Sequence, residues 1–162
     1  MSNHDSPSVN RVRTWLSDAG SDAVIIELAR TARSAEEAAT SIGVELGSIV
    51  KSLVFSIKNE PVMVLISGDR RCNTNILPIA LGIEGKAIQA NPEEVKRATG
   101  FAIGGVAPIA HVQKLPVLID EGLDRFKTIF AAAGHPYFVF ETSFKELAEL
   151  TGGIIRSDIT MA

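Results

Sequence analysis

The sequence predicts an α+β domain with a mixed, strongly curved or barrel-like β-sheet surrounded by short helices. Short apolar runs typical of strands interleave irregularly with short helical patterns, instead of alternating as regular strand–helix units. The 162 residues are 46% hydrophobic and 22% charged, which is enough apolar material for one packed core. No G-x-G-x-x-G motif follows a predicted strand, which argues against a dinucleotide-binding parallel sheet. We therefore expect residues 1–162 to form a single domain.

The N-terminal part of the chain predicts two helices with a strand between them. An apolar stripe over residues 7–19, preceded by a serine and begun by a proline, predicts the first helix. Residues 24–28 are mostly apolar and predict a short strand. Ser34 and Glu37 have the spacing of a capping box, so a second helix is expected over residues 35–42, ended by the following glycine.

The centre of the chain predicts a β-hairpin. Residues 49–57 and 62–66 are apolar runs joined by the turn-forming residues 58–61. Because side chains alternate along a strand, Lys51 lies in the more apolar row, which should be the buried one. An unpaired ammonium group is costly to bury, so Lys51 must reach water, a carboxylate or an anionic ligand. The ordinary alternative is a lysine at the strand's edge, whose ammonium group reaches solvent along its own alkyl chain.

The second half of the chain predicts short helices and strands separated by glycine and proline. Helices are expected over residues 74–81 and 92–99, the second of them begun by Asn91-Pro92. Short strands are expected over residues 86–89 and 117–119.

The C-terminal part predicts a second hairpin and a last helix. The hairpin strands are residues 126–130 and 137–140, joined by a loop over residues 132–136. The alternative is that the alanines of this loop extend a helix. A capping-box spacing predicts the last helix over residues 144–150, and residues 154–162 are weakly specified.

Composition and missing motifs exclude several classes of protein. A net charge of −3 and a pI near 5.6 argue against a protein that coats DNA or long RNA, but they allow a small basic site for one RNA end. The single cysteine, Cys72, excludes an internal disulfide and a multi-cysteine zinc site. No H-E-x-x-H or G-x-S-x-G motif is present, so we expect no metal and no esterase serine. No apolar run could span a membrane and the N-terminus lacks a secretory signal, so we expect a cytoplasmic protein.

Four segments, in order along the chain, resemble one family of proteins. They are IVKSLVF (49–55), VLISGDRR (64–71), TGFAIGGVAPIAH (99–111) and VLIDEGL (117–123). The family is that of the YbaK/ProX aminoacyl-tRNA deacylases, whose relatives include the editing domain inserted in some prolyl-tRNA synthetases. The resemblance runs from about Thr31 to Gly153, and the combination of segments is more specific than any one of them.

The resemblance implies trans-editing, the hydrolysis of the ester that joins a wrong amino acid to the 3′-terminal adenosine of a tRNA. The implied substrate is a proline tRNA that carries a small amino acid such as alanine or cysteine. A synthetase pocket gains only about 1–3 kcal/mol per methylene, so a smaller amino acid enters it too often and a second site must remove the product. The implied partners are the aminoacylated 3′ end of the tRNA and prolyl-tRNA synthetase, with no cofactor, no DNA and no membrane.

The resemblance also assigns candidate catalytic residues. Lys51 matches the family's functional lysine, which would hold the substrate and stabilise negative charge on the ester carbonyl oxygen. Ser52, beside it, would bind substrate. Gly104 and Gly105 match a glycine loop before Pro108, where a bare backbone can approach a ligand. Gly105 would take part in catalysis, and Gly104 and Pro108 would bind substrate. The alternative for both glycines is a structural turn or bulge.

Five further residues are candidates for substrate binding. Asp69, Arg70 and Arg71 match the family's GDRR segment, and arginines suit phosphates; the alternative is a solvated loop or an Asp–Arg pair that shapes it. Asp120 would position the loop, a water or the ribose, or it is a structural carboxylate. His135 would contact the amino acid or a catalytic water, or it is an exposed loop histidine.

The residues leave several questions open. Water, the neighbouring ribose hydroxyl or a cysteinyl thiol of the substrate could attack the ester. The pocket for the amino acid is expected among residues 24–35, Ser52 and the region of His135. Cys72 has no partner motif and is not expected to be a nucleophile, and His111 is a weak candidate. The functional alternatives are a binding or regulatory module of the same fold that does not hydrolyse its ligand, and a hydrolase for another small aminoacyl ester.

Overall fold

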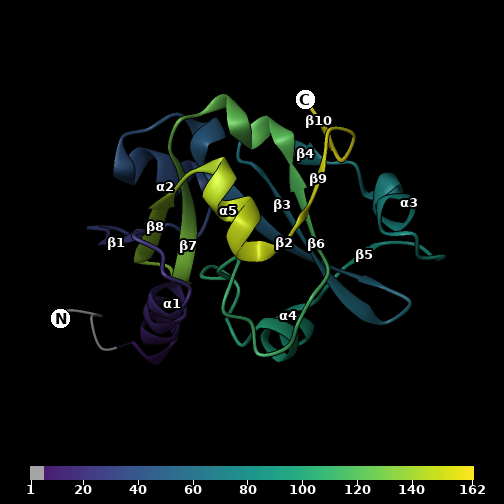
Figure 1. Cartoon of the computed structure of the whole chain (residues 1–162), viewed down its shortest axis with the longest axis horizontal. Coiled ribbons are helices and arrows are strands. Elements are labelled where there is room, and N and C mark those ends of the chain that lie inside the picture. Colours follow the sequence, from purple (N-terminus) through teal and green to yellow (C-terminus); the bar gives the residue numbers. More distant parts are fainter. Residues whose placement is uncertain (1–5) are drawn as a thin grey trace.

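The computed structural model describes residues 6–162, which form a mixed five-stranded sheet and a three-stranded sheet with short helices around them (Figure 1). The larger sheet has the strand order β5-β2-β3-β6-β9, and the smaller has the order β1-β8-β7. Two further strands, β4 and β10, pair with each other. The predicted α+β class with a mixed sheet is confirmed. Within the described residues the strands lie in separate sheets rather than in one closed barrel.

The predicted central hairpin is confirmed as β2 (Val50–Ile57) and β3 (Glu60–Ser67), which pair antiparallel. The strands meet at a two-residue turn, Lys58-Asn59, in which both residues have positive φ, 52° and 64°. These angles are those of a type I′ turn, whose twist matches that of the flanking strands. The predicted turn over residues 58–61 was therefore too long, because its last two residues pair as part of β3.

The other strands of the larger sheet come from distant parts of the chain. β5 (Ile88–Gln89) pairs antiparallel with β2, whereas β6 (Val117–Asp120) and β9 (Ile154–Arg156) extend the sheet in parallel beyond β3. β10 (Thr160–Met161) pairs with β4 (Arg71–Cys72). The C-terminal tail, which the sequence specified only weakly, thus contributes two strands. Segments of two or three residues carry too little alternation to be recognised before their partners are known.

The second predicted hairpin is also confirmed, with different bounds. The smaller sheet consists of β1 (Val24–Glu27), β7 (Ile129–His135) and β8 (Phe138–Thr142). Residues 132–135, which were expected to be the hairpin loop, belong to β7, and the turn is Pro136-Tyr137. Pairing with β8 makes this alanine-rich stretch a strand, because tertiary contacts override local preference.

Short helices begin at the predicted caps Ser34, Asn91 and Ser143. The helix expected over residues 74–81 is instead a 3-10 turn over 74–76 followed by an α-helix over 77–81, and no side chain of the described residues caps either one. Asn91 and Glu94 form a reciprocal capping box, whereas Ser34 and Ser143 each accept one amide bond from a glutamate that does not reciprocate. No helix in residues 6–162 is long and apolar enough to cross a membrane. The helices are α1 (Pro7–Asp18), α2 (Ala35–Ile42), α3 (Leu77–Leu81), α4 (Pro92–Thr99) and α5 (Phe144–Thr151), with 3-10 turns η1 (Leu46–Ser48), η2 (Thr74–Ile76) and η3 (Glu121–Arg125).

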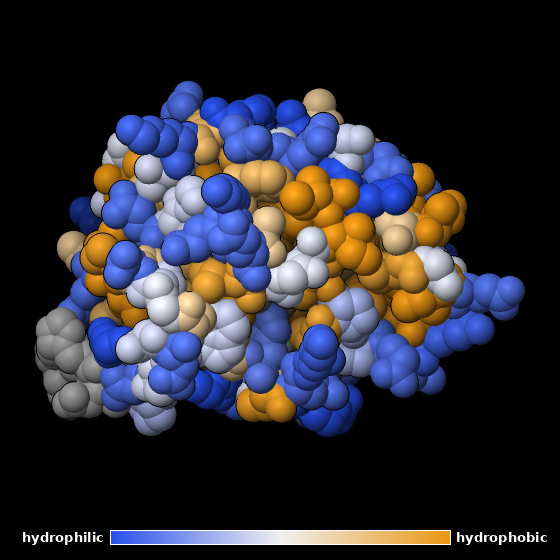
Figure 2. All heavy atoms as spheres, viewed as in Figure 1, coloured by the Kyte–Doolittle hydropathy of each residue, from blue (hydrophilic) through white to orange (hydrophobic). Residues whose placement is uncertain are grey.

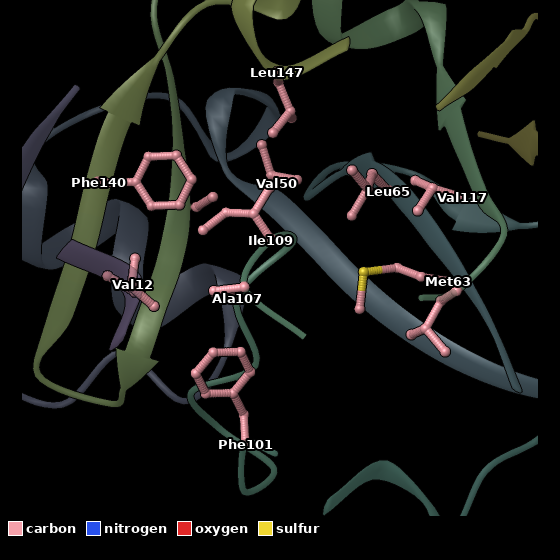
Figure 3. Packing of buried hydrophobic residues seen from close by; sticks show 14 of the residues in the cluster. Val12, Val50, Met63, Leu65, Phe101, Ala107, Ile109, Val117, Phe140 and Leu147 are labelled. Carbon is pink, nitrogen blue, oxygen red and sulfur yellow. The ribbon is translucent and has the colours of Figure 1, made fainter. Parts of the chain in front are cut away.

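Apolar clusters cover both faces of the larger sheet. Val54 and Met63 belong to one cluster, and Phe55 and Val64 belong to the other. Figure 3 shows the first cluster, in which side chains of β2 and β3 lie near those of β8, α5 and the loop after α4. The expectation that only one row of β2 would be buried was wrong, because each face of the sheet has its own cover.

One edge of the larger sheet presents apolar side chains to solvent. Figure 2 shows apolar surface over the region in which β9 lies in Figure 1. Ile154 and Ile155 of this strand are each 48% exposed. β9 ends the strand order of the sheet and has only three residues, so it offers a short edge for pairing with another chain.

Candidate active site

A cavity of about 420 Å³ opens between the first half of β2, the segment leading into α2 and the glycine loop after α4. Its volume lies within the usual range of pockets for small ligands. Apolar side chains dominate its walls, and few polar groups face it. The lining residues are Ala32, Arg33, Ser34, Ala35, Glu36, Ala38, Ile49, Val50, Lys51, Ser52, Leu53, Val54, Gln89, Ala90, Val95, Ile103, Gly104, Val106, Phe130, Ala132 and Val139.

Ser52 is the polar residue of the pocket that the fold leaves least satisfied. Strand alternation places its side chain in one row with Val50 and Val54, both of which line the same cavity. The hydroxyl oxygen is buried and has no hydrogen-bond partner within residues 6–162. A buried hydroxyl without a partner costs about 1–3 kcal/mol, so this group is free to bond a ligand at small additional desolvation cost.

Lys51 also lines the cavity, and its side chain is only partly buried. The ammonium group donates a hydrogen bond to the backbone carbonyl of Arg70, which follows the end of β3. The sequence suggested water, a carboxylate or an anionic ligand as partners, so a backbone carbonyl is an unforeseen one. An ammonium group has further donors beyond the one that this bond uses, and those can serve a substrate.

The two loop glycines have different surroundings. Gly104 lines the cavity with a φ of 99°, a conformation that favours glycine, and it packs near the Cγ atom of Arg33. Gly105 lies against the end of β7, where a Cβ atom would be 2.7 Å from the Cα and N atoms of His135. Its amide donates to the Ala102 carbonyl at 3.1 Å. Pro108 is buried and is not among the lining residues.

Two residues of the GDRR segment, Asp69 and Arg70, form ion pairs outside the cavity lining. Asp69 forms an ion pair with Arg125 at 2.8 Å, and this hydrogen bond lowers the pKa of the Asp69 carboxyl. Arg70 Nη1 lies 3.6 Å from the buried carboxylate of Asp120. Arg71 is exposed in β4. These four predicted binding residues are absent from the lining that the structure describes, and the Arg70 carbonyl accepts a hydrogen bond from Lys51, which is a lining residue.

His111 and His135 both make contacts with neighbouring residues of the chain. His135 ends β7, and its Nδ1 atom accepts a hydrogen bond from the Tyr137 amide at 3.1 Å while the two rings stack. It is not among the lining residues, although it packs behind the loop of Gly104. His111 Nε2 lies 2.8 Å from the Ala107 carbonyl, and burial lowers the pKa of its ring. A neutral imidazole that donates to this carbonyl accounts for both observations.

Two charged residues at the cavity, Arg33 and Glu36, were not singled out from the sequence, although Arg33 lies in the region 24–35 that was expected to form the pocket. Arg33 lies in the segment ahead of α2, lines the pocket and is exposed. The backbone amide of Arg33 donates to the Glu37 carboxylate, and Ser34 caps the helix. The start of α2 therefore fixes the position of the Arg33 backbone. The capping pattern predicted the helix, but no local pattern could place that helix beside the glycine loop. Of the region 24–35 expected to form the amino-acid pocket, the lining contains residues 32–35.

Cys72 gives a first testable expectation, because burial raises the pKa of its thiol to about 11; nearby Lys51 opposes this effect and Asp120 adds to it. At pH 8 we expect iodoacetamide to alkylate Cys72 in the folded protein on the order of 100-fold more slowly than in the urea-unfolded chain. The folded state holds this proton more tightly than the unfolded state, so stability should fall as pH rises towards 11. A folded-state alkylation rate that levels off near the ordinary thiol pKa would contradict this. The chain has one cysteine, so no substitution is needed.

The chain matches the family model described as "Aminoacyl-tRNA editing domain" over residues 29–150. That span contains every residue that lines the cavity. No group of three or more His, Cys, Asp or Glu side chains in the described part of the chain could hold a metal ion.

The proteins that are similar to the chain include two curated proteins and one solved structure, as follows. A protein of Enterococcus faecalis named "Putative Cys-tRNA(Pro)/Cys-tRNA(Cys) deacylase EbsC" is 30% identical over 121 residues, which are 74% of this chain and 73% of that protein. A proline–tRNA ligase of Pseudothermotoga lettingae is 35% identical over 106 residues, 64% of this chain but only 18% of the ligase. A crystal structure described as "a putative trans-editing enzyme for prolyl tRNA synthetase" superposes with a TM-score of 0.89 at 39% identity, covering 97% of this chain and 99% of that one.

Proposed function

This chain belongs to the aminoacyl-tRNA editing domain family, and on that premise we propose that it hydrolyses the ester of a mischarged aminoacyl-tRNA in trans. The substrate we assign is a proline tRNA that carries a small wrong amino acid, such as alanine or cysteine. The named functions of the similar proteins support this choice, because one acts on Cys-tRNA(Pro) by name and another is described as serving prolyl-tRNA synthetase.

The observation that carries the proposal is the cavity shared by Lys51, Ser52 and Gly104. The lining of this mostly apolar pocket combines a lysine, a serine with a free hydroxyl and a bare stretch of backbone. Strand alternation directs the Lys51 side chain to the other face of β2 from Ser52, where its ammonium group bonds the Arg70 carbonyl beside the pocket. An aminoacyl-adenosine needs such a combination: an apolar surface for the base and the side chain, and polar donors for the ester. The 3′ end of a tRNA is single-stranded, so it can enter a pocket of this size without unpairing a helix.

The proposed chemistry is stabilisation of negative charge by preorganised donors. When the ester carbonyl is attacked, its oxygen gains negative charge, and the free donors of the Lys51 ammonium group are suited to bind it. Ser52 would hold a polar group of the substrate beside this oxygen. Water, the neighbouring ribose hydroxyl or the thiol of a cysteinyl substrate forms the new bond to the carbonyl carbon, the ester bond to the 3′ oxygen breaks, and that oxygen takes the proton that the attacking group loses. Water releases the free amino acid directly. Attack by the ribose hydroxyl moves the acyl group to the 2′ oxygen, and attack by the thiol gives a cyclic thioester, so in both cases water must still hydrolyse the product.

Arg33 would bind the phosphate that precedes the terminal adenosine. It lines the pocket, is exposed and stands at the segment that leads into α2. A guanidinium group suits a phosphate through paired hydrogen bonds. This role replaces neither Arg70 nor Arg71, which would contact phosphates farther along the acceptor end.

Small lining residues support the choice of a small amino acid. Five alanines, Ala32, Ala35, Ala38, Ala90 and Ala132, lie in the walls, and the free hydroxyl of Ser52 faces the cavity. Apolar walls discriminate weakly, by about 1–3 kcal/mol per methylene, so alanine and cysteine would both be accepted. Their relative rates depend on whether the substrate thiol takes part in the attack.

A panel of proline, alanine and cysteine tRNAs, each charged with several amino acids, tests the function. We expect release of alanine or cysteine from the proline tRNA, and no release of proline, as measured by loss of radiolabelled aminoacyl-tRNA. Saturable binding without turnover on any member would replace the proposal with the non-catalytic module. Equal turnover on small aminoacyl esters without tRNA would replace it with a general aminoacyl ester hydrolase. Adding prolyl-tRNA synthetase to the same assay tests it as a partner.

A further inference from the structure

A buried carboxylate with incomplete partners lies beside the Lys51 network. Asp120 ends β6 and is 0% exposed. Its Oδ2 atom accepts a hydrogen bond from the Thr160 hydroxyl at 3.2 Å, whereas Oδ1 has no hydrogen-bond partner within residues 6–162. A carboxylate is costly to bury unless other groups compensate its charge. Its presence in the core therefore needs an account beyond packing.

Arg70 is the cation that faces this carboxylate. Its Nη1 atom lies 3.6 Å from Asp120 Oδ2. Gly122 leaves the space that both groups occupy, because a Cβ atom there would lie 2.5 Å from Arg70 Nη1 and 2.6 Å from Asp120 Oδ2. The backbone carbonyl of the same arginine accepts the hydrogen bond from the Lys51 ammonium group. Arg70 thus joins the buried carboxylate to the proposed catalytic lysine.

The C-terminal strand β10 and the residue before it bond the backbone that follows Arg70. β10 pairs with β4, which follows Arg70 directly, and the Asn73 amide donates to the Ile159 carbonyl at 2.8 Å. Ile159 is fully buried in the cluster that also contains Phe55 of β2. The chain around Arg70 is therefore fixed by backbone bonds from the same segment that supplies Thr160.

We propose that Asp120 is a positioning residue: by pairing with Arg70 it fixes the carbonyl that orients the Lys51 ammonium group, and Thr160 holds Asp120 in place. Asp120 does not touch the substrate. The proposal rests on the proposed function only for what Lys51 does, and not for how Lys51 is placed. Because a misplacement of about 1 Å can cost about 100-fold in rate, a residue that acts only through another can still have a large effect.

The first arm of the test is kinetic. Asp120→Asn keeps the shape of the side chain and an acceptor for Thr160, but it removes the charge that faces Arg70. We expect a fall in kcat of about 10- to 100-fold with KM changed less than about twofold. Asp158→Asn is the matched control, since Asp158 forms an exposed ion pair with Arg156 near the same C-terminal strand, and its kcat should stay within about twofold. A rise in KM at unchanged kcat would overturn the proposal, because Asp120 would then act on substrate binding, directly or through Arg70, and not on Lys51.

The second arm does not depend on activity. In protein labelled with ζ-15N lysine, the Lys51 signal should shift and its ammonium hydrogens should exchange faster in Asp120→Asn, but not in Asp158→Asn. If the wild-type protein deacylates nothing while this shift occurs, the proposed function fails and the positioning stands. If kcat falls while the Lys51 signal stays in place, the positioning fails and the function stands. No shift and no loss of kcat would overturn the proposal as well.

Thr160 keeps the proposal testable if Asp120→Asn does not fold. Thr160→Val removes the hydroxyl that bonds Asp120 but leaves the backbone pairing of β10 with β4. We expect the same direction of change in kcat and in the Lys51 signal, about two- to fivefold in rate, and recovery in Thr160→Ser, which restores the hydroxyl. Equal behaviour of the valine and serine variants would overturn the proposal.

Discussion

Lys51→Ala is expected to lower the rate constant for deacylation by about 10²–10³-fold while the protein stays folded. The lysine lines the cavity and gives one hydrogen bond to the Arg70 carbonyl, so the remaining donors are those that would meet the ester oxygen. Charge develops on that oxygen only as the ester is attacked. The loss should therefore appear in kcat more than in KM. Single-turnover deacylation of mischarged proline tRNA measures it directly.

Two variants control for charge and fold. Lys127→Ala removes an exposed lysine that is not among the lining residues and should leave the rate within about twofold. Lys51→Arg keeps the positive charge but changes its shape, so it should recover only part of the rate. Urea unfolding must show that Lys51→Ala is folded under assay conditions. A folded Lys51→Ala protein with a rate near that of the wild type would remove Lys51 from the mechanism.

Gly105→Ala should lower the free energy of unfolding by roughly 2–3 kcal/mol. An added Cβ atom would lie 2.7 Å from both the Cα and the N atoms of His135, and these are backbone atoms of β7 that cannot move aside as a side chain could. The glycine loop would have to lift away from the smaller sheet. Urea-induced unfolding, followed by circular dichroism, measures the change.

Gly153→Ala is the matched control for this substitution. Neither glycine has a positive φ, so backbone strain is similar in both variants. The nearest atoms at Gly153 are side-chain atoms of Thr151 and Val117, at 3.1 and 3.2 Å, which can shift slightly. Its cost should stay below about 1 kcal/mol. If Gly105→Ala were no less stable than Gly153→Ala, close packing on β7 would not be the reason for glycine there, and a direct role of Gly105 in the site would gain weight.

The candidate site could be predicted from the sequence in part. The segment around Lys51 and the glycine loop resembled known motifs, and the structure places Lys51, Ser52 and Gly104 at one cavity. Arg33 escaped notice because its relevance depends on where α2 lies relative to the loop. Asp69 and Asp120 were grouped with the binding residues because they stand in recognisable segments, yet their contacts are with Arg125 and with Arg70 and Thr160.

Local chemistry was enough for much of the fold. Helix starts were readable at Asn91 and Ser143, because a side chain that bonds a free amide acts within one turn of the chain. The central hairpin was readable because each of its strands is long enough to show an apolar run. The alanine-rich end of β7 could not be predicted as a strand, because alanine favours a helix and only pairing with β8 makes this stretch a strand.

The sequence by itself determined the class of fold, the main helices and hairpins, and the family whose motifs the chain carries. Tertiary structure alone decided which faces of β2 are covered, that the tail returns to pair with β6 and β4, and that Asp120 reaches Arg70. The physical reason is range: caps, turns and alternation are set by neighbours within a few residues, whereas burial and ion pairing depend on groups that the chain brings together from far apart.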